Sequence, residues 1–93
     1  MYIGVIIGTV VATRKDEKFV GHKLLLTQPV NVDKEPIGEP LVAIDTVGAG
    51  IGEFVFFTSG TAARYAANKP NSPIDAAVVG IIDGVDLDKS VLK

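Results

Sequence analysis

The chain has 93 residues, a formal net charge of −2 and no cysteine, and 47% of its residues are hydrophobic. This length is typical of one domain, so 1–93 is expected to form a single unit. The acidic balance disfavours proteins that bind nucleic-acid backbones or anionic membranes, because both need clustered basic residues. Without cysteine there are neither disulfides nor thiolate metal sites, so stability has to come from packing and from partners.

The N-terminal segment MYIGVIIGTVVATRK is as apolar as an export signal but lacks two features of one. No basic residues precede the apolar run, and the run ends in charged residues without a small-residue cleavage site. Residues 2–13 are also too few to span a membrane as a helix. We therefore expect a cytoplasmic protein whose first strand begins at once.

Five short apolar segments, rich in β-branched residues and bounded by Gly, Pro, Asn or Asp, predict strands. These segments are 2–13, 22–28, 41–47, 53–58 and 75–82. Without helical crossovers a parallel sheet of the Rossmann type is improbable. The pattern predicts a small, mainly β barrel or sandwich.

The segments between the predicted strands indicate turns, a loop and one helix. The charged residues 14–18 predict a polar hairpin turn, and three prolines make 29–40 a loop. The alanine-rich stretch 60–68 predicts a short helix, capped by Ser59 or Thr58 and followed by a turn-rich loop at 68–73. About two turns of helix are not stable alone, so this helix must pack against the strands.

Several predicted strands are apolar on both faces. In the fourth, Val55 and Phe57 point one way while Phe54 and Phe56 point the other. A solitary antiparallel barrel alternates apolar residues inside with polar residues outside. No predicted helix is long enough to cover a second apolar face, so the pattern favours an obligate oligomer. Scattered apolar side chains on an ordinary surface are the alternative.

The stretch VGAGIGEF places Gly48, Gly50 and Gly52 at alternate positions, followed by Glu53 and a predicted strand. The dinucleotide fingerprint GxGxxG opens a helix, and a P-loop ends in Gly-Lys-Ser/Thr, so neither fits. Glycines at this spacing are more typical of a tight turn with positive φ and of a close approach by another backbone. We expect no cofactor.

The sequence gives little support for a metal site or a catalytic site. His22 is the only histidine and cannot anchor an ordinary zinc site in a chain without cysteine. Asp83, Asp86 and Asp88 lack the ligand order of an EF-hand, so a solvated acidic tail is favoured. Ser59 has no histidine or lysine base close in sequence, so helix capping explains it better than nucleophilic catalysis.

Four stretches together resemble the EutN/CcmL family of bacterial microcompartment vertex proteins. They are GTVVATRK at 8–15, GHKLLLTQPV at 21–30, VAIDTVGAGIGEFVFFTSGTAAR at 42–64 and PIDAAVVGIIDGVDL at 73–87. The resemblance runs over nearly the whole chain. It implies a five-stranded OB-like barrel with one short helix that assembles into a ring. It also implies pentamers that cap the fivefold vertices of cytoplasmic shells built from hexameric shell proteins, without enzyme activity.

The resemblance also implies where subunits touch. By motif, one stretch matches the family's signature loop and a second its Ser-rich segment, and we expect both at or near subunit contacts or the fivefold axis. The residues are Gly48, Ala49, Gly50, Gly52 and Glu53 in the first stretch, and Ser59, Gly60, Thr61, Ala63 and Arg64 in the second. Glu53 and Arg64 are opposite charges that could pair within or between subunits. Gly60-Thr61 departs from the Ser-Ser or Gly-Ser of many relatives.

Two other classes of function remain as alternatives. An OB-type binding module for single-stranded nucleic acid or a small ligand would share the barrel, with Tyr2, Phe54, Phe56 or Tyr65 as stacking residues. The net charge disfavours it. A small enzyme ranks last, because no base–nucleophile pair or metal set is apparent. The tail 83–93 either extends over a neighbouring subunit through its apolar residues or frays.

Overall fold

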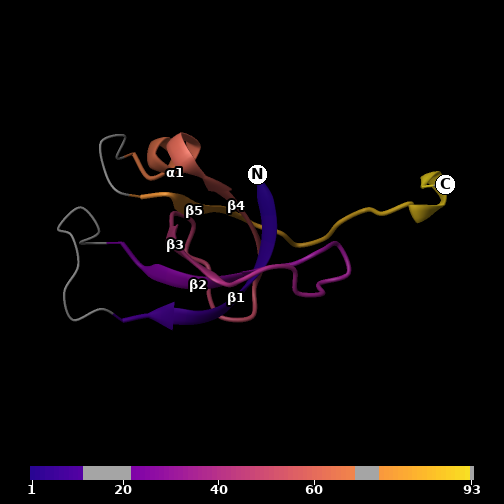
Figure 1. Ribbon diagram of the computed structural model, residues 1–93, viewed down its shortest axis with the longest axis horizontal. Helices are drawn as coiled ribbons and strands as arrows, with labels where there is room; N and C mark the ends of the chain where they lie inside the picture. Colours follow the sequence, from indigo (N-terminus) through magenta and orange to yellow (C-terminus); the bar gives the residue numbers. More distant parts are fainter. Residues whose placement is uncertain (12–21, 69–73, 93) are drawn as a thin grey trace.

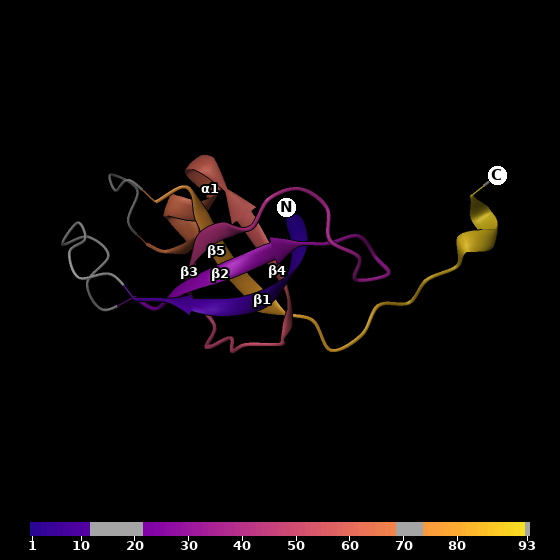
Figure 2. The ribbon, with the colours of Figure 1, turned by 60° about the horizontal axis from the view of Figure 1, so that its bottom comes forward.

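The computed structural model describes residues 1–11, 22–68 and 74–92. Its elements are β1 (Tyr2–Val10), β2 (Leu24–Pro29), β3 (Leu41–Asp45), β4 (Phe54–Ser59), α1 (Gly60–Ala66), β5 (Ala76–Ile81) and the 3-10 turn η2 (Lys89–Val91). The strands close a barrel in the order β1-β2-β3-β5-β4 (Figures 1 and 2). The mainly β barrel of five strands with one short helix, predicted from the sequence, is confirmed.

One pair of neighbouring strands in the barrel is parallel. β3 and β5 pair through Ile44 with Ala77 and through Asp45 with Val78, whereas the other four pairs are antiparallel. β4 lies between them in the sequence and reverses the direction of the chain. β5 therefore runs the same way as β3, and the connection between these two strands contains β4 and α1.

Several element boundaries differ from the predicted ones. β1 ends at Val10, before the predicted limit, and the strand predicted for 41–47 ends at Asp45, whose side chain binds the following amides. The helix predicted for 60–68 ends at Ala66. The predicted hairpin turn at 14–18 and, apart from Asn68, the loop predicted at 68–73 lie outside the described residues.

The start of α1 corrects the predicted cap. Ser59 occupies the N-cap position, but its side chain makes no capping hydrogen bond. Instead the Gly60 N–H donates to the Asp75 carbonyl at 2.9 Å, which ties the first turn of α1 to the residue before β5. Gly60 has φ +62°, a conformation in which glycine avoids the steric cost of a side chain.

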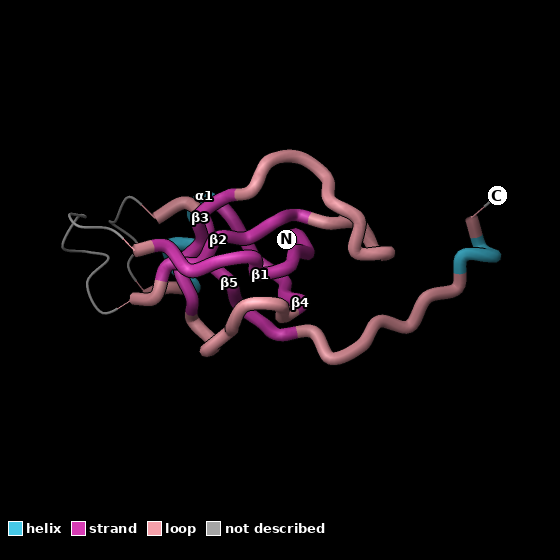
Figure 3. Tube along the Cα trace, turned by 90° about the horizontal axis from the view of Figure 1, so that it is seen from below, coloured by secondary structure: helices cyan, strands magenta, loops and turns pink. Residues whose placement is uncertain are grey.

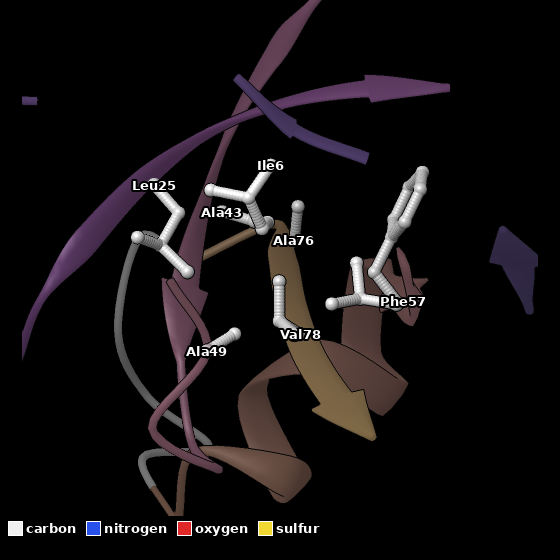
Figure 4. Close-up of a cluster of buried hydrophobic side chains, with 8 residues drawn as sticks. Ile6, Leu25, Ala43, Ala49, Phe57, Ala76 and Val78 are labelled. Atoms are coloured by element: carbon white, nitrogen blue, oxygen red, sulfur yellow. The ribbon is translucent and has the colours of Figure 1, made fainter. Parts of the chain in front are cut away.

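The barrel interior is filled from alternate positions of all five strands, as the two-residue period of a strand requires. The buried cluster comprises Ile6, Leu25, Ala43, Ala49, Val55, Phe57, Ala76 and Val78 (Figure 4). Ala49 is the exception, because it belongs to the loop 46–53 between β3 and β4 rather than to a strand. That loop therefore closes one end of the barrel with a fully buried methyl group.

A second buried cluster joins α1 to the outside of the sheet. It comprises Leu24, Ile44, Ala63, Ala67, Ile74 and Ala77. The prediction that no helix covers a second apolar face is therefore wrong for the part formed by β2, β3 and β5. Two turns suffice because the alanines of α1 let its backbone approach the strands closely. The outer side of β1 and β4 is not covered in this way.

Candidate assembly site

The signature loop 46–53 is built around the carboxylate of Asp45. Its Oδ1 accepts hydrogen bonds from the backbone amides of Val47 and Gly48 at 3.1 Å and of Ala49 at 3.2 Å. Lys23 places its Nζ 3.5 Å from Oδ2 and also donates to the Ala49 carbonyl. Only 5% of the Asp45 side chain is exposed, and an almost buried carboxylate needs such partners.

A second carboxylate closes the other half of the loop. Glu53 Oε1 accepts from the Gly50 amide at 2.7 Å, while the Glu53 N–H donates to the Gly50 carbonyl at 3.1 Å. Gly52 N–H donates to the Ile6 carbonyl at 2.8 Å, which attaches the loop to β1. Glu53 thus has a partner in its own loop. The amides that a phosphate would need are bound to the protein's own carboxylates.

The three glycines of the loop have different roles. Gly48 and Gly52 have φ values of +79° and +90°, so the backbone itself favours glycine there. Gly50 has no positive φ, and a Cβ at that position would meet only Glu53 Oε1, at an ordinary 3.6 Å. The fold of one subunit therefore gives no reason for a glycine at position 50.

The Ser-rich segment lies at the opposite end of β4 from the signature loop. β4 separates them by about 17 Å, at about 3.3 Å per residue. Ser59 and Thr61 are exposed, Arg64 is half-buried, and Ala63 points into the cluster beneath α1. The structure therefore keeps the two predicted stretches apart, as two separate candidate contact regions. Ala49 and Ala63 pack inside the subunit.

An apolar surface that α1 leaves open lies on the outer side of β1 and β4, with the Lys34 Nζ 5.0 Å from the centroid of the Phe54 ring. We call it the outer face, formed by Ile3, Val5, Ile7, Phe54 and Phe56. Ile3 pairs with Phe56 and Val5 with Phe54 across the two strands, so their side chains share one side. All are half-buried or exposed. The sequence predicted two-sided apolar strands, but only the structure shows which face α1 leaves open.

A hollow of about 670 Å³ lies at the barrel end where β4 finishes. We call it the mouth groove, lined by Tyr2, Pro29, Leu41, Val42, Phe57, Ser59, Asp75 and Ala76. Tyr2 stacks on Phe57 with ring centroids 5.5 Å apart. The lining is largely apolar, with Ser59 and Asp75 as its most polar residues. No motif in the sequence indicated this groove, because its residues come from all five strand ends.

The described residues contain few features that would support a metal site, a membrane span or a base-stacking surface. Within 1–11, 22–68 and 74–92, no three His, Asp or Glu side chains are close enough to hold a metal ion. No helix in these ranges is long and apolar enough to cross a bilayer. The aromatic residues considered for base stacking do not form one surface: Phe54 and Phe56 are on the outer face, Tyr2 lines the mouth groove and a second, shallow hollow that reaches Phe56, and Tyr65 is on α1.

Comparisons with known proteins agree with this fold. Residues 1–83 match the family model described as ethanolamine utilisation protein EutN/carboxysome. The microcompartment shell vertex protein GrpN of Rhodospirillum rubrum is 49% identical over 86 residues, covering 92% of this chain and 97% of that protein.

Two solved structures are also similar. CcmL of Gloeobacter violaceus has a TM-score of 0.86 at 45% identity, covering 95% of this chain and 91% of that one. The structure described as the GrpN pentameric microcompartment shell protein has a TM-score of 0.84 at 45% identity, covering 95% of this chain and all of that one. With its barrel, its signature loop and these matches, the chain belongs to the EutN/CcmL family.

Proposed function

We propose that this chain is a structural shell protein that forms pentamers and caps the fivefold vertices of a bacterial microcompartment. Family membership supports the shell role, and the pentameric description of the GrpN structure supports the number five. The observation within this chain that carries the proposal is the outer face. On this proposal it acts as a scaffold without catalysis, together with hexameric shell proteins.

The outer face is suited to contact with another subunit. Its aliphatic and aromatic side chains lie side by side on paired strands, and burying such a surface is favourable in proportion to its apolar area. Contiguous apolar patches of this kind mark interaction sites more often than free surface. A ring needs two different surfaces on every subunit, so the outer face is expected to meet another region of the next copy.

The signature loop and the Ser-rich segment are proposed as further contact regions. Gly50 supports this proposal, because nothing within one subunit requires glycine there. A close approach by a neighbouring backbone would explain it. Replacing Gly50 with leucine is expected to break assembly while leaving the barrel folded, as read by native mass spectrometry and circular dichroism. Normal pentamers from this variant would contradict a contact at Gly50.

The decisive experiment measures the absolute mass of the native protein in solution. Light scattering on a sizing column is expected to give five subunits for the unaltered chain. Ile7→Lys places a charge on the outer face and is expected to reduce the mass. Val32→Lys is the matched control, because Val32 is 45% exposed against 47% for Ile7 but lies outside that face. A monomeric native protein, or equal masses for both variants, would refute the proposed ring face.

The OB-type binding module is not favoured. The net charge of −2 does not suit a groove for a nucleic-acid backbone, and Tyr65 lies on α1, apart from the other candidate stacking residues.

A further inference from the structure

The chain ends in a segment that leaves the barrel, which we call the C-terminal arm, residues 82–92. Its first residue, Ile82, still donates its N–H to the Phe54 carbonyl at 2.8 Å. Beyond it the chain runs away from the strands to the small turn η2 (Figure 3). The arm carries four exposed apolar side chains, namely Val85, Leu87, Val91 and Leu92.

The arm has few bonds to the rest of its own chain. Among the described residues, one ion pair ties it back: Lys89 Nζ lies 2.7–2.8 Å from the two carboxylate oxygens of Asp33. Both side chains are about half exposed, and exposed pairs contribute little. Holding each residue of an extended segment in one conformation costs entropy. The Lys89–Asp33 pair alone does not compensate for this cost, so the arm needs a covering surface.

The tip of the arm forms a short 3-10 turn, η2, that is stabilised by hydrogen bonds to one side chain. Asp88 accepts hydrogen bonds from the Ser90 amide, at 3.0 Å, and from the Ser90 hydroxyl, and so caps η2. These bonds lower the pKa of the Asp88 carboxyl below its ordinary value. The acidic tail expected from the sequence is therefore exposed at Asp88 but locally structured, and η2 presents Val91 and Leu92 outward.

The mouth groove offers the complementary surface. It is concave and mostly apolar, while the arm is extended and carries exposed apolar residues. The groove and the root of the arm lie at opposite ends of β4, since Ser59 lines the groove and Ile82 binds Phe54. The groove lining also contains the acidic residue Asp75, and the arm carries the basic residue Lys89, which pairs with Asp33 within the subunit.

We infer that the C-terminal arm of each subunit docks in the mouth groove of the adjacent copy of this chain. This inference rests on the proposed ring, because only a ring supplies each groove with a neighbouring arm. Arm and groove are two different surfaces on one subunit, which is what a heterologous, closing contact requires.

The arm is long enough to reach the next subunit. At about 3.3 Å per residue, the segment 82–92 spans about 35 Å when extended. The two shorter dimensions of the molecule are 23 and 22 Å. An arm longer than the barrel is wide can leave one barrel and cross the face of the next.

Disulfide trapping tests the contact, and it has no background because the chain has no cysteine of its own. Leu87→Cys marks the arm and Val42→Cys marks the groove. Mixing the two single variants, allowing subunits to exchange and oxidising mildly is expected to give a covalent dimer of unlike chains. A chain carrying both substitutions is expected to give a ladder reaching five linked subunits. Each single variant alone serves as the control and should give neither product.

Three outcomes overturn the inference. Native pentamers that give no cross-link beyond the single-variant controls show that the ring stands without this contact. A link formed within one chain shows that the arm returns to its own groove. A monomeric native protein removes both the ring and the arm contact, so the mass measurement separates failure of the proposed function from failure of this inference.

A second variant covers the case in which sulfur geometry prevents the bond. Leu87→Asp introduces a charge into the arm contact and is expected to raise the concentration at which pentamers half dissociate at least tenfold. Val11→Asp is the control, because Val11 is an exposed apolar residue outside both arm and groove. Equal dissociation of both variants contradicts docking of the arm.

Discussion

Single residues in the signature loop separate the needs of the fold from those of assembly. Gly52 sits at φ +90°, whereas Gly50 has no positive φ and room for a Cβ. Gly52→Ala is therefore expected to lower the free energy of unfolding by about 1–2 kcal/mol, the cost of a left-handed conformation for an ordinary residue. Gly50→Ala is the control within one subunit and should change it by less than about 0.5 kcal/mol when both variants are compared in the Ile7→Lys background, where the ring contributes least. Urea unfolding at one fixed protein concentration gives both values.

The conformation of the signature loop depends on the carboxylate of one residue, Asp45. Asp45→Ala removes the acceptor for three backbone amides and the partner of Lys23. Leaving such donors unsatisfied costs about 1–3 kcal/mol, so a loss in that range is expected in urea unfolding. Asp33→Ala, which breaks only an exposed ion pair, should cost about 0–1 kcal/mol. Equal losses would show that the loop is not organised around Asp45.

Among the elements, β4 and β5 meet through an unusual pair of residues. The Phe56 ring lies across Gly80, its partner in the register, and a Cβ on Gly80 would fall 2.1 Å from ring atoms. Gly80→Ala is expected to displace the ring and cost about 1–3 kcal/mol. It should also disturb the outer face and hence the oligomer mass.

The matched control for this element is Gly8→Ala in β1. A Cβ at Gly8 would lie 3.6 Å from the Leu26 Cβ, an ordinary contact, so little loss is expected. Thermal unfolding monitored by circular dichroism compares the two variants. If Gly8→Ala proves as damaging as Gly80→Ala, loss of glycine in a strand explains the effect, and the Phe56 contact does not.

The positions of most strands and of the helix could be predicted from the sequence, because strand and helix periodicity are local properties. Segments apolar on both faces, such as 53–58, correctly indicated strands, and β4 occupies Phe54–Ser59. Ala49 could not be recognised as the end of the core, since it reaches the interior only when the loop folds around Asp45. The parallel pairing of β3 with β5 depends on barrel closure, which no local pattern encodes. The mouth groove is missed for the same reason.

At the candidate site, too, the sequence pattern could not predict which residues contact each other. The motif GxGxG does not distinguish Gly50 from its neighbours, and only the backbone angles do so. Likewise, Glu53 and Arg64 were candidates for an ion pair by charge alone, but the side chain of Glu53 turns to the Gly50 amide. A sequence shows which chemical groups are present, whereas their partners depend on the path of the chain.

For the whole molecule, the proposed ring couples folding to assembly. A subunit that unfolds must leave the ring, so mass action makes the measured stability depend on protein concentration. For five subunits, a tenfold rise in concentration adds roughly 1 kcal/mol per subunit. In a domain of this size that corresponds to a rise in Tm of about 5 °C.

This dependence can be tested by calorimetry over a hundredfold range of concentration. The native protein is expected to show the rise, whereas Ile7→Lys, with its charge on the outer face, should have a lower Tm that hardly changes with concentration. A constant Tm for the native protein at concentrations where it is pentameric would mean that the barrel unfolds without leaving the ring or is stable alone. The outer face would then contribute to assembly but not to the stability of the subunit, and the apolar pattern of β1 and β4 would serve the shell alone.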